Sequence, residues 1–129
     1  MLQVGDTSKS VTLQSQHERS CTLLEDAIWI VAWDKATTRL ANEYFQKHSM
    51  KQNEQLLIDV SQVPTGILNL FVLPRMRSYK HEILLAHDEI YNRTLPYKEN
   101  AITLLSIKKG KVEKIDFAED EEELQALLR

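Results

Sequence analysis

The feature that most constrains the fold is the apolar run Ile28-Trp29-Ile30-Val31-Ala32-Trp33, which passes directly into a segment with helical periodicity. A short, continuous run of strand-forming residues is typical of a strand covered on both faces. Asp34 is placed to cap the helix that follows, in which apolar side chains recur at helical spacing (Leu40, Ala41, Tyr44, Phe45 and His48). The sequence therefore predicts a central buried strand followed by a helix that packs on the sheet.

Further strands are predicted by apolar runs and by strict apolar–polar alternation. They cover residues 55–60, 81–86, 101–107 and 112–117, with a turn at Lys109-Gly110 between the last two. Residues 11–14 and 21–24 predict an N-terminal β-hairpin, and a helix capped by Asp120 ends the chain. Strands joined through helices pair in parallel and hairpins pair antiparallel, so we expect an α/β fold with a mixed sheet and helices on both sides.

The segment after the second buried strand predicts a helix with Pro64 in its first turn. Ile67, Leu70 and Phe71 fall on one stripe of this helix and are expected to form its inner face. Pro74 lacks the backbone N–H that a helix interior needs, so the helix is expected to break or kink there. Residues 75–79 would then form a separate short turn or helix.

The composition is that of an ordinary globular domain. The chain has 129 residues, of which 43% are hydrophobic and 27% charged, and we expect one domain over residues 1–129. Residues 1–27 would be an N-terminal extension and residues 28–129 the core. The net charge of −3 disfavours nucleic acid and anionic membrane as partners. No run is long and apolar enough to predict membrane insertion.

The order of these elements, with Trp33 at the end of the central strand, resembles that of the thioredoxin-like superfamily, in particular its TlpA-like and peroxiredoxin-like members. The resemblance implies a thioredoxin-like mixed sheet with an N-terminal hairpin. In that family the loop after the strand reads Trp-Cys-x-x-Cys, whereas this chain has Asp34 and Thr37 at the two cysteine positions. Asn100-Ala101 stands where the family has a cis-proline, so a trans bond is expected there. Disulfide exchange is therefore not expected.

The loss of both cysteines and of the proline leads to the first hypothesis, a redox-inactive binding or scaffold module without a cofactor. Its surface would consist of loops that the resemblance places at one end of the sheet (Trp33, Asp34, Lys35, Thr37, Arg75, Arg77, Tyr79, Asn100 and Ala101). An exposed Trp33 indole would anchor a protein partner there. Helix capping by Asp34 and a solvated basic turn at residues 75–79 are the simpler structural interpretations.

Cys21 is the only cysteine and carries the competing hypothesis, a one-cysteine thiol peroxidase or redox sensor. It lies in the second strand of the predicted hairpin, where a small packed residue is the simpler interpretation. A third hypothesis uses His81, His87 and Asp88 as ligands for a metal or a small molecule. Their spacing is more typical of unrelated surface residues, and no metal site is predicted.

The first residues suggest a compartment. Leu2-Gln3-Val4-Gly5-Asp6 resembles the opening of mature exported thioredoxin-like and peroxiredoxin-like chains. If an export signal has been removed, the protein is periplasmic or secreted, with the cytoplasm as the alternative. A single cysteine is compatible with either compartment.

Overall fold

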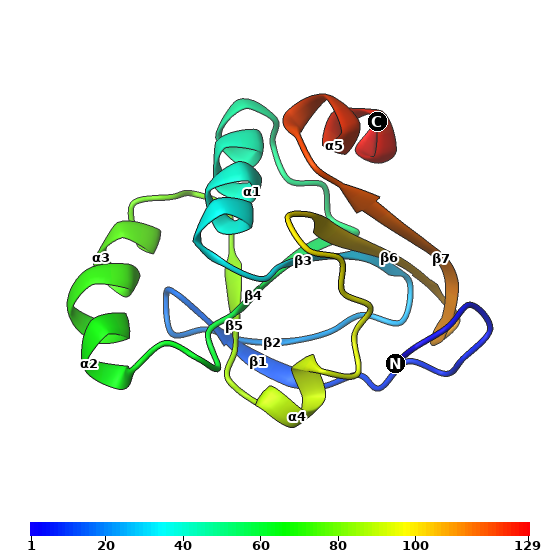
Figure 1. The fold of residues 1–129 in the computed structure, drawn as a ribbon, viewed down its shortest axis with the longest axis horizontal. Coiled ribbons are helices and arrows are strands. Elements are labelled where there is room, and N and C mark those ends of the chain that lie inside the picture. Colours follow the sequence, from blue (N-terminus) through cyan, green and yellow to red (C-terminus); the bar gives the residue numbers. More distant parts are fainter.

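The computed structural model describes residues 1–129, and its centre is a seven-stranded sheet in the order β2-β1-β5-β4-β3-β6-β7 (Figure 1). The strands are β1 (Thr12–Ser15), β2 (Ser20–Thr22), β3 (Ala27–Ala32), β4 (Glu54–Asp59), β5 (Ile83–Ala86), β6 (Ile102–Lys108) and β7 (Lys111–Ala118). β3, β4 and β5 pair in parallel, and all other pairs are antiparallel. The predicted mixed sheet and both predicted hairpins are confirmed.

Strand β3 is covered on both faces, as its apolar run predicts. Ile30 and Ala32 belong to one core cluster, and Trp29 and Val31 belong to a second cluster on the opposite face. Trp29 and Ile30 have no exposed surface. Because successive side chains of a strand point to opposite faces, only a continuous apolar run can fill both clusters.

One face of the sheet is covered by three helical segments. α1 (Lys35–Lys47) and α5 (Glu121–Leu128) lie side by side, and Lys47 forms an ion pair with Glu121 (3.0 Å) (Figure 1). The third segment is a continuous helical rod after β4, made of α2 (Thr65–Ile67), the π-helical η1 (Leu68–Val72) and α3 (Leu73–Met76). None of the helices has the length and hydropathy needed to cross a membrane.

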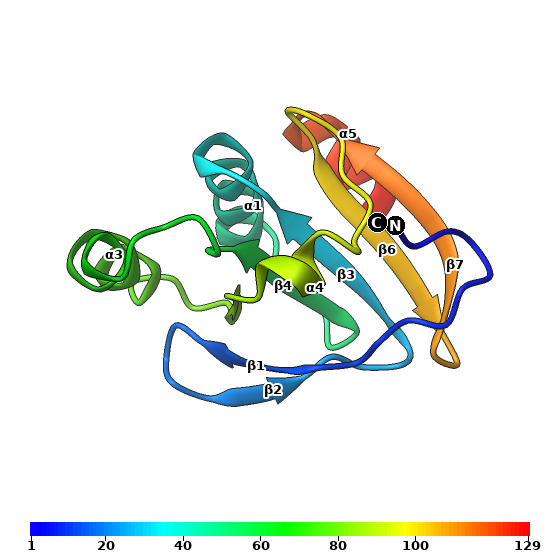
Figure 2. The same ribbon diagram turned by 60° about the horizontal axis from the view of Figure 1, so that its bottom comes forward.

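The opposite face is covered by a short helix and by the beginning of the chain (Figure 2). α4 (Glu89–Asn92) contributes Tyr91, whose hydroxyl donates to the Lys9 carbonyl (2.9 Å). Residues 5–8 hydrogen-bond to Gly110 and Val112 at the β6–β7 hairpin. The chain then runs from the β7 edge of the sheet to the opposite edge, where β1 pairs with β5. The N-terminal extension is thus part of the same sheet as the core.

The helical rod after β4 packs with a different face from the one that the sequence predicts. Ile67, Leu70 and Phe71 are 47%, 71% and 67% exposed, so the expectation that they form the inner face is wrong. Leu68 and Met76 are buried instead. The rod is apolar on two sides, so its periodicity alone does not decide which side faces the sheet.

The helical rod continues through Pro74, so the expected break is absent. The Leu73 N–H donates to the Leu68 carbonyl five residues earlier, so the turn just before the proline is π-helical. Pro74 has no N–H to donate and would interrupt the hydrogen bonds of a regular α-helix. The wider π turn changes the bonding pattern from four to five residues just before the proline. Residues 73–76 therefore continue the rod as α3.

The orientation of the rod predicts unequal effects for two neighbouring leucines. Leu68→Ala should lower the free energy of unfolding by about 2–5 kcal/mol, because it empties a buried site. Leu70→Ala should change it by less than about 0.5 kcal/mol, because the side chain is exposed. Urea unfolding of the two variants measures the difference, and equal losses would contradict this orientation.

Candidate functional site

The loop after β3 is closed by hydrogen bonds around Asp34 and Thr37. Asp34 Oδ1 accepts a hydrogen bond from the Thr37 N–H (2.8 Å). The Thr37 hydroxyl oxygen accepts from the backbone N–H groups of Trp33 (2.9 Å) and Asp34 (3.0 Å). This reciprocal capping box satisfies free donors at the start of α1. Asp34 and Thr37, which stand where the thioredoxin-like family has its two cysteines, thus cap the N-terminus of α1.

Trp33 is half-buried, so its indole is less exposed than expected. Its Nε1–H donates to the Thr103 hydroxyl (2.9 Å), which in turn donates to the Pro96 carbonyl (2.7 Å). Tyr97 packs edge-on against the Trp33 ring, with centroids 5.3 Å apart, and is 51% exposed. The accessible aromatic surface at this end of the sheet therefore includes Tyr97, which is not among the predicted site residues.

A hollow of about 390 Å³ lies beside Trp33, at the carboxyl ends of β3 and β4. Asp34, Asp59 and Glu89 contribute carboxylates to its wall, and Arg93 forms an ion pair with Glu89. In open α/β sheets, ligands bind in the crevice outside the carboxyl ends of the strands. This hollow is therefore the first candidate site.

Two polar residues in the wall of this hollow are coupled to each other. Asp59 Oδ1 accepts hydrogen bonds from the Ser61 N–H (2.9 Å), the Ser61 hydroxyl (2.6 Å) and the Asn92 amide (2.8 Å). Asn92 is buried, and its Oδ1 has no hydrogen-bond partner. Neither Asp59 nor Asn92 is among the predicted site residues, although the place of Asp59 at the end of a parallel strand indicates this end of the sheet.

Asn100 and Ala101 lie at the same end as Trp33, as predicted. They precede β6, whose antiparallel register pairs Thr103 with Val31. All peptide bonds are trans, including the Asn100-Ala101 bond, and Asn100 has a positive φ of 62°. Ala101 is fully buried, so it offers no side chain to a partner.

Arg75, Arg77 and Tyr79 lie at the other end of the sheet, so the expectation that they join Trp33 is wrong. β3, β4 and β5 are parallel. The loop that leaves β3 and the loop that enters β5 are therefore at opposite ends. Arg77 Nε donates to the Gln16 carbonyl (3.1 Å) beside the start of β5. The predicted surface is divided into two parts.

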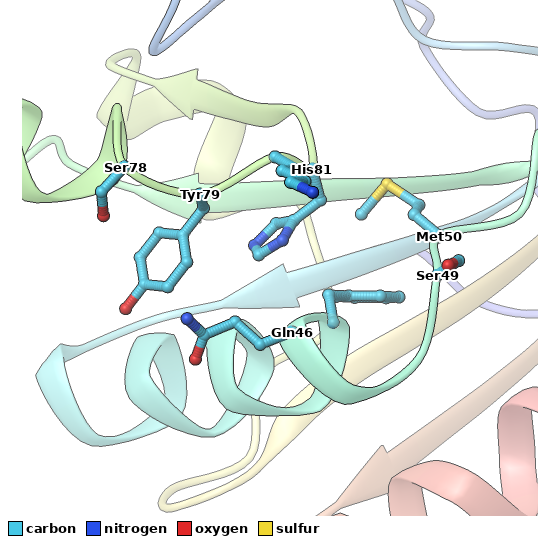
Figure 3. A pocket seen from close by; sticks show the side chains of 8 residues that line it. Gln46, Ser49, Met50, Ser78, Tyr79 and His81 are labelled. Carbon is cyan, nitrogen blue, oxygen red and sulfur yellow. The ribbon is translucent and has the colours of Figure 1, made fainter.

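Tyr79 lines a second hollow, of about 570 Å³, between the end of α1 and the loop before β5 (Figure 3). His81 lies between the rings of Tyr79 and Phe45, with ring centroids 5.1 Å and 5.7 Å away. Burial lowers the pKa of the His81 imidazole. His87 and Asp88 follow β5 at its other end, so the proposed histidine and carboxylate ligands do not come together.

No family model matches this sequence, and no curated protein matches it. Solved structures do match over nearly the whole chain. A Chlorobium tepidum protein assigned as a thiol:disulfide interchange protein of the DsbE type is 15% identical, with a TM-score of 0.68 and coverage of 98% of this chain and 94% of that one. The exposed lipoprotein thioredoxin of Streptococcus pneumoniae is 9% identical (TM-score 0.62; 93% and 98%). The peroxidoxin BcpB of Mycobacterium tuberculosis is 14% identical (0.58; 98% and 92%). The chain has the thioredoxin fold.

Within this thioredoxin fold, Cys21 is far from the position of a redox cysteine. It lies in β2 at the edge of the sheet, opposite Leu13, and is half-buried. Burial and the nearby Glu82 carboxylate raise the pKa of its thiol, and Arg19 offsets part of this effect. A nucleophilic cysteine needs a lowered pKa. These surroundings therefore disfavour the thiol hypothesis.

The raised pKa predicts slow alkylation of native Cys21 at neutral pH. The thiolate is the reacting species, so the rate with iodoacetamide should rise with pH and have its midpoint above the ordinary value of about 8.5. Rates measured from pH 6 to 10, in native and in urea-unfolded protein, test this prediction. A native midpoint below the unfolded one would contradict it.

The capping box predicts a modest and specific loss of stability. Asp34→Ala should lower the free energy of unfolding by about 0.5–2 kcal/mol, because an N–H at the start of α1 loses its acceptor. Asp34→Asn keeps a capping oxygen and should lose much less. Thermal unfolding of the two variants measures the difference, and equal losses would show that the carboxylate charge, rather than the cap, is what matters.

Proposed function

We propose that this protein is a redox-inactive thioredoxin-like binding module. Its protein partner binds at the carboxyl ends of the parallel strands β3 and β4. The observation that carries the proposal is the Asp34–Thr37 capping box, which occupies the position of the redox loop. Neither side chain can form a mixed disulfide. The remaining thiol, Cys21, is in a different part of the sheet and has a raised pKa.

The partner surface consists of the rim of the hollow beside Trp33. Trp33 and Tyr97 supply aromatic area, and Tyr97 is half-exposed. Asp34 and Lys35 are exposed and supply charges of both signs. Aromatic anchors surrounded by polar groups are typical of the residues that dominate protein–protein binding. Of the predicted surface, Arg75, Arg77 and Tyr79 are left out because they lie at the other end of the sheet.

We also propose a bacterial envelope setting for this module, with the cytoplasm as the alternative. The support is the resemblance of residues 2–6 to the opening of exported chains, together with the structural match to an exposed lipoprotein thioredoxin.

Site-specific photo-cross-linking in cells of the source organism tests the partner surface. Replacing Tyr97 by p-benzoylphenylalanine puts the cross-linker on the proposed surface with little change in shape. Phe71 is a matched control, because it is an exposed aromatic residue on the helical rod away from this surface. We expect discrete cross-linked proteins from position 97, reduced by Lys35→Glu, and none of the same proteins from position 71. The same cross-linked proteins from both positions, or no cross-linked protein from position 97, would contradict the proposal.

A further inference from the structure

We propose that the hollow between the end of α1 and the loop before β5 is a binding site for a small, flat organic acid that donates a hydrogen bond to His81. The site is at the opposite end of the sheet from the proposed partner surface and does not depend on it. Its volume of about 570 Å³ is within the range of about 300–1,000 Å³ that is usual for small-molecule sites.

His81 is held with one ring nitrogen free. Its Nε2 lies 2.8 Å from Oδ1 of the buried Asn42, which accepts the Nε2 proton. The neutral imidazole then has its lone pair on Nδ1. Nδ1 has no hydrogen-bond partner in the protein, although His81 is only 9% exposed. Figure 3 shows the ring directed into the hollow. Nδ1 is not among the fully enclosed polar atoms that lack a partner, so we infer that this acceptor is accessible to a ligand in the hollow.

The walls of the hollow fit a flat ring. Tyr79 and Phe45 lie on two sides of the His81 imidazole. Met50 adds a flexible apolar side chain from the segment after α1 (Figure 3). Aromatic rings and methionine sulfur make favourable contacts with a planar aromatic ligand. The ligand would therefore place an aromatic ring against the faces and edges of these side chains that line the hollow.

The charge at the rim favours an anion. Lys80 is the one charged residue in the lining, and none of the lining residues is acidic. Lys80 forms no ion pair within the protein. Gln46, Ser49 and Ser78 complete the rim with uncharged polar groups. A carboxylate on the ligand would meet the free ammonium in a charge-assisted hydrogen bond.

Titration with 4-hydroxybenzoate, followed by NMR shifts of the backbone amides of residues 45–50 and 78–81, tests the site. This probe has a ring, a hydroxyl donor and a carboxylate, whereas benzoate lacks the donor and phenol lacks the acid. We expect saturable shifts confined to these residues. The affinity for 4-hydroxybenzoate should be at least about fivefold higher than for either analogue, which corresponds to one hydrogen bond. Absence of saturable shifts, or equal affinities for all three probes, would overturn the proposal.

Two variants separate the roles of the ring nitrogen and the cation. His81→Phe keeps a flat ring and removes Nδ1, so 4-hydroxybenzoate should then bind no better than benzoate. Lys80→Met keeps the length of an exposed side chain and removes its charge, so it should weaken both acids and leave phenol unchanged. Lys111→Met is the control for a cation elsewhere on the surface. A preference for 4-hydroxybenzoate over benzoate that persists in His81→Phe, or an unchanged affinity of Lys80→Met for both acids, would contradict the assigned contacts.

Discussion

The burial of β3 on both faces, together with its pairing on both sides, constrains the rest of the structure. β4 lies parallel to β3 and β6 lies antiparallel to it, so β3 has no free edge. Each parallel connection must return the chain to the opposite end of the sheet through a helix. Loops before and after these strands are therefore sorted to the two ends. This sorting places Trp33 at one end and His81 at the other, and one hollow lies beside each of these residues.

The turn between β3 and α1 carries Asp34 and Thr37 where the redox members of the thioredoxin-like superfamily have cysteines. The turn between β3 and α1 needs groups that satisfy the free N–H donors at the helix start. Asp34 and Thr37 do this with reciprocal hydrogen bonds, and Thr37 is buried while doing so. The Trp33 indole is tied to β6 through the Thr103 hydroxyl. The end of the sheet is thus held by local hydrogen bonds, and its remaining polar groups are available for binding.

Much of the fold could be predicted from the sequence, because apolar runs and caps are local signals. The strand at β3, the hairpins and the caps Asp34 and Asp120 are where the pattern places them. The side of the rod that packs on the sheet could not be predicted, because both of its sides are apolar and a π turn interrupts its helical periodicity. The division of the site could have been predicted from the parallel strand order. The contact of Tyr97 with Trp33 could not, because it depends on an irregular loop.

We propose that the fold is used here without thiol-disulfide exchange. The reduction of insulin by dithiothreitol, with and without the protein, tests this most directly, with an active thioredoxin as the positive control. We expect insulin to precipitate at the same rate in the presence and absence of the protein, because Cys21 has no second thiol in the chain to resolve a mixed disulfide. Acceleration by the wild type that is lost in Cys21→Ser would contradict it.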